Sequence, residues 1–246
     1  VVVKVADKHF LVPAASVVYE NMREDAFEMQ RVLTHKKSVV DISIWADKMQ
    51  KVYGDDGLIG IAYVFCTLFR DICFAIDHNF PHLYAYGERS SGKSKWAESL
   101  TAVFYNDRAA FNLNSGTDYA FFEYMRSFRN CPAHLNEFDD KVVKDEWFQA
   151  IKGVFDGESR VRGKMGSRTQ LEIQKVLSGL ILTGQYLSTK DDNSITTRSL
   201  IRPFHEKSYS QKEKQDYDEL KEWEAKGISG LLLDILQYRK EIEAGY

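Results

Sequence analysis

Cysteine is scarce in this sequence, and its spacing matches no common framework. The three cysteines are Cys66, Cys73 and Cys131, and no two of them form a Cys-x-x-Cys pair. An odd, widely spaced set argues against a disulfide scaffold and against a zinc site made from paired cysteines, and it is typical of a reducing compartment. We therefore expect a cytoplasmic protein in which these cysteines are small core residues.

Long hydrophobic runs are missing as well. The most apolar stretch, Leu58 to Phe69, is shorter than the roughly 20 residues that a membrane-spanning helix needs, and the charged Arg70 and Asp71 follow it directly. We expect no signal peptide before it. We expect no association with a membrane. Because the chain opens on Val1 without an initiator methionine, we also expect it to be part of a longer polypeptide.

Neither sign of charge is in large excess. The 33 Lys and Arg residues against 36 Asp and Glu give a net charge of -3, so the whole molecule is not a polycation that would bind nucleic acid unaided. Such binding would need a local basic patch. Only 4 Pro and 15 Gly stand beside 44% hydrophobic residues in 246, which is typical of an ordered globular protein that buries a full core.

From residue 56 on, strand-length apolar segments alternate with helix-like ones. The periodicity predicts helices over Leu58 to Ile76 and Lys95 to Phe104, and strands over His82 to Tyr86, Cys131 to Leu135, Val176 to Thr183 and Leu200 to Phe204. Such alternation is typical of an α/β fold with a central parallel sheet flanked by helices.

The two ends of the chain differ from this core. Residues 1–55 predict a short strand (Val1 to Val5) and two amphipathic helices, which end at the turn Tyr53 to Gly57. Residues 206–246 combine the densely charged stretch His205 to Lys226 with one closing helix over Ile228 to Glu243. We therefore expect an N-terminal helical segment resembling a collar or linker (1–55), a core (56–205) and a C-terminal helical segment (206–246).

The sharpest motif follows the strand that ends at Tyr86. It matches the phosphate-binding loop pattern, two glycines four residues apart followed by Lys and Ser, and comprises Gly87, Glu88, Arg89, Ser90, Ser91, Gly92, Lys93 and Ser94. A strand, this loop and a helix in that order allow backbone N–H groups and the helix N-terminus to hold phosphate oxygens. Lys93 would then reach the β- and γ-phosphates of ATP, and Ser94 would bind Mg²⁺. The sequence therefore predicts a P-loop NTPase fold.

An acidic residue at the end of a neighbouring strand is the next requirement of such a site. The run Cys131 to Asn136 ends in Glu137, which could bind the metal and act as general base toward the attacking water. Asp139 and Asp140 are close rivals for this role.

Polar and basic residues follow at two later strands. The strand Val176 to Leu182 leads into Thr183-Gly184-Gln185, whose side chains could contact the γ-phosphate or its water. Arg198 and Arg202 flank the last short strand, and an arginine presented by a neighbouring subunit would stabilise the charge of a transferring phosphoryl group.

The stretch from residue 159 to 170 carries cations and no acids. Two glycines after the alternating Arg-Val-Arg predict a hairpin with a basic tip that could neutralise nucleic-acid phosphates. The cations are Arg160, Arg162, Lys164 and Arg168. The stretch has no aromatic residue, so base stacking is not indicated.

The order of these motifs resembles the ring-forming helicase ATPases of superfamily three, which are related to AAA+ proteins, and most of all the primase-helicases of phages, plasmids and mobile elements. The likeness runs from about Leu58 to Phe204. It rests on Gly87 to Ser94, Asn136-Glu137, Val154 to Arg162, Leu182 to Gln185, and Thr197-Arg198 to Phe204.

The resemblance implies roles residue by residue. Lys93 and Ser94 match the Walker A lysine and hydroxyl, and Glu137 matches the glutamate that polarises water. Gln185 stands where the family usually has its sensor asparagine, and Arg198 matches the arginine that acts across a subunit interface. Three positions depart from the pattern: Asn136 replaces an acid, Gln185 an asparagine, and Thr197 a second arginine.

The resemblance also implies an activity and partners. The family members are DNA helicases or translocases that hydrolyse ATP with Mg²⁺, assemble as rings, here expected to be hexamers, and move along single- or double-stranded DNA. In this family Arg160, Arg162 and Lys164 fall in a DNA-contacting loop, and a fused or associated primase or DNA-recognition domain often precedes the motor. Two alternatives stay open: a nucleotide-gated, weakly hydrolysing loader, favoured by Asn136, and a small-molecule phosphotransferase that uses the same loop.

Overall fold

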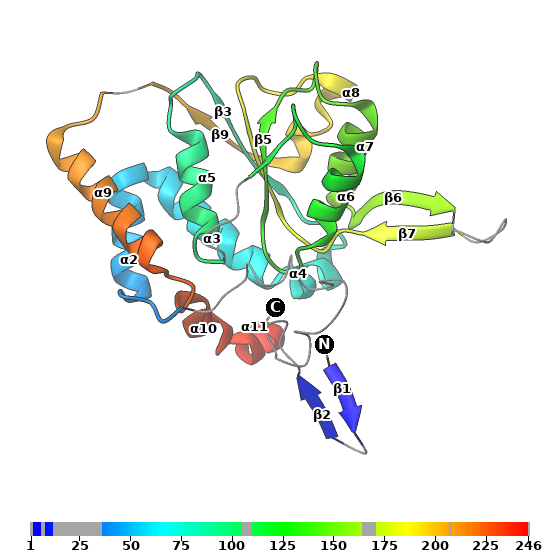
Figure 1. Ribbon diagram of the computed structural model, residues 1–246, viewed down its shortest axis with the longest axis horizontal. Coiled ribbons are helices and arrows are strands. Elements are labelled where there is room, and N and C mark those ends of the chain that lie inside the picture. Colours follow the sequence, from blue (N-terminus) through cyan, green and yellow to red (C-terminus); the bar gives the residue numbers. More distant parts are fainter. Residues whose placement is uncertain are drawn as a thin grey trace, which may run out of the picture.

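The computed structural model describes residues 2–5, 8–11, 36–104, 110–163, 171–206 and 208–245. Its centre is a five-stranded sheet in the order β4-β5-β8-β3-β9 (Figure 1). The strands are β3 (His82–Gly87), β4 (Phe111–Asn112), β5 (Ala133–Phe138), β8 (Leu180–Gly184) and β9 (Ser199–Phe204). Every neighbouring pair is parallel. The predicted α/β fold with a central parallel sheet flanked by helices is confirmed, and it is that of a P-loop NTPase.

Helices connect and cover these strands. They are α2 (Ile42–Tyr53), α3 (Asp55–Leu68), α4 (Arg70–Asp77), α5 (Lys93–Thr101), α6 (Asp118–Arg126), α7 (Asp145–Val154), α8 (Lys190–Asn193), the 3-10 turn η2 (Thr196–Arg198), α9 (Gln211–Lys226), α10 (Leu231–Leu236) and α11 (Arg239–Gly245). Two antiparallel hairpins complete the described elements: β1 (Val2–Val5) with β2 (Lys8–Leu11), and β6 (Glu158–Gly163) with β7 (Leu171–Lys175). The β6–β7 hairpin projects from the body beside α7 (Figure 1).

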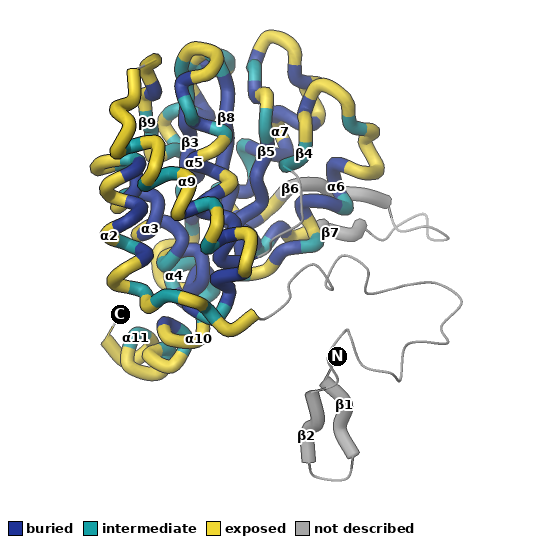
Figure 2. Tube along the Cα trace, turned by 60° about the vertical axis from the view of Figure 1, so that its left-hand side comes forward, coloured by how far each residue is buried: buried dark blue, intermediate teal, exposed yellow. Residues whose placement is uncertain are grey.

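The inner strands read as apolar runs because both of their faces are covered. Every residue of β8 is buried, as are Leu83, Tyr84 and Ala85 of β3 (Figure 2). The same buried cluster includes Trp45 and Leu220, from the segments before and after the sheet. The predicted division at residues 55 and 205 stays a prediction.

The helix predicted over Leu58 to Ile76 is wrong as a single element. It is two helices, α3 and α4, that meet at 79°, and the backbone at Phe69 leaves the helical conformation (φ -109°, ψ 22°). Phe69 and Arg70 are both buried, and the Arg70 guanidinium lies over the ring of Phe74 at 4.7 Å. The bend therefore brings both side chains into the core.

Two further expectations need correction. The closing helix over Ile228 to Glu243 is divided into α10 and α11, and α11 begins at Arg239, whose guanidinium forms an ion pair with Asp71 of α4. The cysteines are not all core residues, because Cys66 is exposed while Cys131 is buried. Cys66 lies on the exposed side of α3.

Within the described residues, no single helix has the length and apolar character to cross a membrane. Helices α3 and α4 meet these two criteria only when counted together, and a bend of 79° separates them.

The segments before and after the sheet are held together by ionic contacts. Lys48 of α2 is buried, and its Nζ donates to Asp216 Oδ1 at 2.6 Å and to Glu219 Oε2 at 2.7 Å, both on α9. Lys221 of α9 donates to Ser99 Oγ of α5 at 3.0 Å. These contacts fix α9 against α2 and α5, next to the loop that follows β3.

Candidate nucleotide site

The loop between β3 and α5 has the backbone of an anion-binding turn. Gly87, Ser90 and Gly92 adopt positive φ angles of 150°, 62° and 91°. A Cβ atom at Gly87 would lie 1.9 Å from the carbonyl oxygen of Phe204, so only glycine fits between β3 and β9 here. Left-handed residues in a tight loop turn successive N–H groups inward, and α5 begins at Lys93 with its N-terminus at the loop. We therefore expect this loop to hold an anion.

Lys93 places a cation inside the curl of the loop. Its side chain is buried, and Nζ donates to the carbonyl oxygen of Glu88 at 2.8 Å. Burial lowers the pKa of Lys93, while the nearby charge of Glu137 acts in the opposite direction. Lys93 and Glu137 therefore face the same space, although one follows β3 and the other lies on β5.

A hydrogen-bonded chain joins the loop to the two neighbouring strands. The Oδ1 atom of Asn136 accepts from Thr183 Oγ1 at 2.7 Å and from Ser94 Oγ at 3.3 Å. Because the proton of Thr183 goes to Asn136, its oxygen accepts from Nε2 of His134, 3.0 Å away. Burial lowers the pKa of His134 to about 4, which favours the neutral ring at pH 7. Asn136 thus links the phosphate loop to β8.

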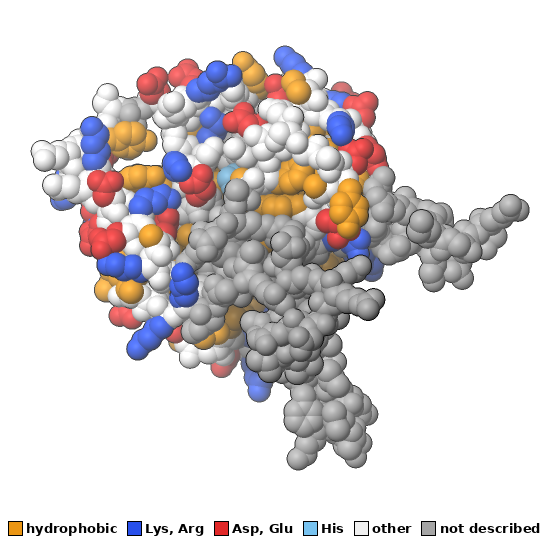
Figure 3. Space-filling model, viewed as in Figure 1, with side chains coloured by type: hydrophobic (Ala, Val, Ile, Leu, Met, Phe, Trp, Pro, Cys, Tyr) orange, Lys and Arg blue, Asp and Glu red, His pale blue; other side chains and the backbone are white. Residues whose placement is uncertain are grey.

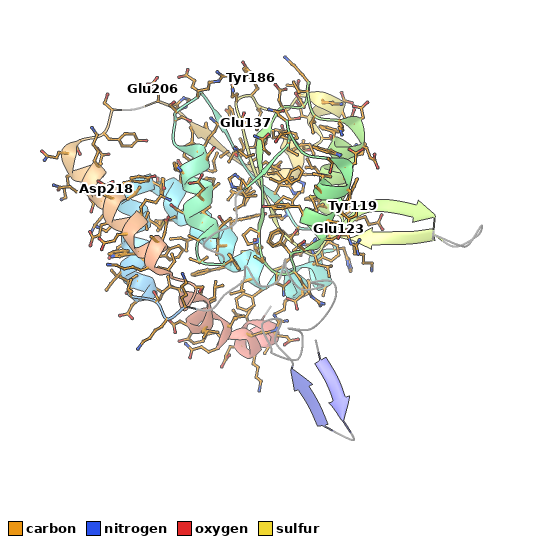
Figure 4. All side chains as sticks on the ribbon, in the orientation of Figure 1. Tyr119, Glu123, Glu137, Tyr186, Glu206 and Asp218 are labelled. Carbon is orange, nitrogen blue, oxygen red and sulfur yellow. The ribbon has the colours of Figure 1, made fainter. Side chains whose placement is uncertain are left out.

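Glu137 is turned out of its strand by a bulge. The register of β5 against β8 shifts between Asn136 and Phe138, and Glu137 itself has φ of 60°. A bulge re-aims one side chain, and a non-glycine residue in this conformation stores strain of the kind found at functional sites. Glu137 is exposed at the end of the sheet from which Tyr186 also projects (Figure 4).

These groups line one cavity of about 440 Å³ at the carboxyl ends of β3, β5 and β8. Its lining residues from the strand ends and the loop include Lys93, Ser94, Asn136, Glu137, Thr183 and Gln185. Ligand sites of open α/β sheets lie outside the carboxyl ends of the strands. The structure therefore brings the predicted loop, Glu137 and Gln185 together.

The two rival acids are engaged elsewhere. Asp140 Oδ2 accepts from Ser188 Oγ at 2.9 Å and from the backbone N–H groups of Thr189 and Lys190 at 2.6 and 2.9 Å. Burial raises the pKa of Asp140, but these hydrogen bonds outweigh it and lower the pKa. Asp139 accepts from the N–H of Lys141 at 2.9 Å. Asp140 fixes the chain after β8, and neither acid lines the cavity.

Arg198 lies away from this cavity. Ser199, which follows it, pairs with His82 at the start of β3. Arg198 therefore lies at the amino-terminal ends of these strands, whereas Gly87 lies at their carboxyl ends. Its Nη1 donates to the carbonyl oxygen of Ser194 at 3.0 Å, and its guanidinium lies 5.5 Å from the ring centre of Phe155. A contribution of Arg198 to the site of another subunit stays a prediction.

Arg202, the second arginine flanking β9, is paired within the chain. Its Nε donates to Asp56 Oδ1 at 2.5 Å.

The basic hairpin is described only in part. Arg160 and Arg162 lie on β6, opposite Gln174 and Glu172 of β7, whereas Lys164 and Arg168 lie outside the described residues. On the face shown in Figure 3, Lys and Arg side chains of the described residues are interspersed with Asp and Glu. That face offers no single-sign patch among the described residues, and DNA binding by the hairpin stays a prediction.

Residues that the motif analysis missed complete the site. His134 lies two positions before Asn136, so both side chains leave β5 on the same face. Asn112 of β4 and Asn114 after it also line the cavity. The signal for His134 was a polar residue inside an otherwise apolar strand.

The donor set suits a hard cation. No group of three or more His, Cys, Asp or Glu side chains among the described residues could hold a metal alone. Ser94, Asn136 and Glu137 instead offer oxygen atoms on one wall of the cavity. Mg²⁺ prefers oxygen ligands and is usually bound by one or two protein groups together with substrate phosphates and water, which fits this wall.

One solved structure among the comparisons with known proteins supports the fold. No protein-family model matches the chain, and a search of curated proteins finds no match. The solved structure of "SCCmec type IV Cch - active helicase" has a TM-score of 0.55 at 15% identity, over 85% of this chain and 40% of that one. This chain therefore shares the fold of a helicase while spanning less than half of that protein.

Two more solved structures are less similar. The A-form apo structure of the NrS-1 C-terminal region has a TM-score of 0.43 at 13% identity, over 83% of this chain and 47% of that one. The X-ray structure of JCV helicase has a TM-score of 0.40 at 13% identity, over 83% and 66%. Their scores are too low to add to the argument.

Proposed function

We propose that this chain is the ATPase part of a nucleic-acid motor, a DNA helicase or translocase that acts in the replication of a mobile element or phage. The observation that carries the proposal is the meeting of Lys93, Ser94, Asn136 and Glu137 around one cavity at the ends of three adjacent parallel strands. A triphosphate is the ligand class that a glycine-bounded loop, a buried lysine and a hydroxyl at a helix N-terminus recognise together.

Each group has a chemical task in ATP hydrolysis. The loop N–H groups and Lys93 would bind and orient the β- and γ-phosphates, and Ser94 with Asn136 would hold Mg²⁺, which would supply positive charge against the charge that develops on the phosphate oxygens. Glu137, which lines the same cavity, would accept the proton of the attacking water, and Gln185 and Thr183 would orient that water beside the γ-phosphate.

The motor also needs an arrangement beyond one chain. We infer a cytoplasmic ring, of six subunits by resemblance, in which Arg198 of one subunit completes the site of the next and the basic hairpin with Arg160 and Arg162 contacts DNA. A primase or DNA-recognition domain would accompany the motor in the longer polypeptide.

The decisive experiment is the rate of ATP hydrolysis with and without single-stranded DNA. We expect turnover that DNA stimulates and that Lys93→Ala abolishes, because the variant loses the cation that binds the γ-phosphate. Exposed Lys240→Ala, on α11, is the control, because Lys240 lines none of these cavities, and the variant should retain activity. Turnover that Lys93→Ala leaves unchanged would contradict the proposal.

One observation favours a second function. Asn136, which replaces an acid, binds Mg²⁺ less strongly than a carboxylate does because it carries no charge. A nucleotide-gated loader that binds ATP tightly and hydrolyses it slowly would show saturable binding with turnover that DNA does not stimulate.

A further inference from the structure

A second cavity lies on the other side of the phosphate loop. Its volume is about 240 Å³. It is lined by Val52 and Tyr53 of α2, by Ser90 and Gly92 of the loop, by Tyr209, which precedes α9, and by Tyr217 of α9; three charged residues of α5 and α9 also line it. We name it the tyrosine pocket. Ser90 lines both this pocket and the larger cavity that holds Lys93 and Glu137. The two cavities therefore lie on either side of one loop.

The two cavities differ in chemistry in the way that the two halves of a nucleotide differ. The larger cavity presents oxygen and nitrogen atoms from Lys93, Asn136 and Glu137. The tyrosine pocket presents three tyrosines and Val52 beside three charged residues of α5 and α9. A nucleoside triphosphate joins a polyanion to a flat aromatic base. Bases bind aromatic side chains by stacking, which tolerates variation in sequence and grows with the ring surface that is covered.

The pocket is held in shape before any ligand arrives. The hydroxyl of Tyr53 contacts Ser99 Oγ at 2.9 Å and donates to the carbonyl oxygen of Lys95 at 3.1 Å. Burial raises the pKa of Tyr53 well above its usual value, so the hydroxyl stays protonated. On the opposite wall, the bonds from Lys48 to Asp216 and Glu219 fix α9 against α2. A preformed pocket reduces the entropy lost on binding.

We propose that the tyrosine pocket binds the base of the nucleotide, that the base is a purine, and that α9 is thereby part of the nucleotide site. The proposal rests on the proposed function, since it takes the phosphate loop to be occupied by the phosphates of the same molecule. A purine is favoured over a pyrimidine because its two fused rings cover more of the three tyrosine faces. The C-terminal segment then contributes directly to nucleotide affinity, although it follows the last strand of the sheet.

The test compares ligands with and without a base. Isothermal titration calorimetry with Mg²⁺ measures the binding of ATP, CTP and inorganic tripolyphosphate to the wild-type chain, Tyr217→Leu and Tyr209→Leu. For the wild type we expect ATP to bind at least about tenfold more tightly than CTP or tripolyphosphate. For each variant we expect ATP affinity to fall by about tenfold while tripolyphosphate affinity stays unchanged. Leucine keeps most of the volume without the aromatic face, and unchanged tripolyphosphate binding shows that the variant is folded.

The matched control is Tyr119→Leu, a highly exposed tyrosine on α6. Figure 4 places Tyr119 on the opposite side of the molecule from Asp218, the neighbour of Tyr217 on α9. This variant should bind ATP as the wild type does.

The outcomes separate the two proposals. If ATP binds and Lys93→Ala weakens it, but both tyrosine variants bind ATP as tightly as the wild type, the pocket proposal is overturned and the proposed function stands. If CTP binds as tightly as ATP, the purine assignment is overturned. If the wild type binds neither ATP nor tripolyphosphate, both proposals fail.

Discussion

The backbone of Glu137 leads to a prediction in which stability and activity move in opposite directions. At φ of 60° an L-residue has its Cβ close to the following carbonyl oxygen, which costs about 1–2 kcal/mol. Glycine has no Cβ and avoids that cost, but it gains about 0.4–1 kcal/mol of extra freedom in the unfolded chain. Because Glu137 is exposed, loss of its attraction to Lys93 subtracts only a few tenths of a kcal/mol.

Glu137→Gly should therefore raise the free energy of unfolding by about 0.5 kcal/mol, or the melting temperature by about 1–2 °C for a chain of this size. It should also abolish ATP turnover while leaving nucleotide binding intact. Urea unfolding followed by circular dichroism measures the first effect, and a turnover assay beside a binding assay measures the second.

Glu137→Ala is the matched control for the strain. It removes the same carboxylate but keeps the Cβ, so we expect no gain in stability. If the glycine variant is no more stable than the alanine variant, the conformation of Glu137 stores no strain and the reasoning is refuted.

Three other predictions concern neighbouring residues. Asn136→Asp should lower several-fold the Mg²⁺ concentration needed for half-maximal turnover, because a carboxylate binds the metal more strongly than an amide; an unchanged Mg²⁺ titration would count against its place at the metal. Asp140→Asn should cost about 1–3 kcal/mol of unfolding free energy at pH 7. Because the folded pKa of Asp140 is lowered, its stabilisation is complete above about pH 4 and is lost as the pH falls through the folded pKa, so urea unfolding should show the two proteins converging at acid pH. Arg198→Ala should bind ATP without hydrolysing it, and mixing it with Lys93→Ala should restore part of the turnover; the absence of any restoration would argue for a site completed within one chain.

The sheet could be predicted because its signals are local. Strands that are buried on both faces are continuous apolar runs, and the runs around Leu83, Leu135 and Leu182 all became strands of the parallel sheet. The order of the strands could not be predicted from local signals, because it depends on contacts between segments far apart in the chain. The insertion of β8 between β3 and β5 is nevertheless what brings Thr183 to Asn136.

Breaks within apolar helices could not be predicted from the periodicity of the sequence. The residues around Phe69 continue a helical pattern, and only the packing of Phe69 and Arg70 in the core reveals the bend. The same holds for the division between α10 and α11, where the ion pair of Arg239 with Asp71 joins segments 168 residues apart.

The candidate site was predictable in part for the same reason. A loop of fixed spacing such as Gly87 to Ser94 is a local signal, and Glu137 was found because it follows the apolar run that predicted a strand. Sequence spacing could not show which of Glu137 and Asp140 lines the cavity. A bulge in β5 turns Glu137 out of its strand, whereas Asp140 is held by backbone amides up to 50 residues away in the chain. The tyrosine pocket was invisible, since its walls are assembled from α2, the loop and α9.

A crystal structure of this chain with Mg²⁺ and a non-hydrolysable ATP analogue tests the central claim most directly. The account predicts electron density for the β- and γ-phosphates within the loop from Gly87 to Ser94, with Lys93 Nζ turned from the Glu88 carbonyl to the phosphate oxygens. A loop that keeps the Lys93–Glu88 bond and holds no phosphate at saturating analogue would contradict it.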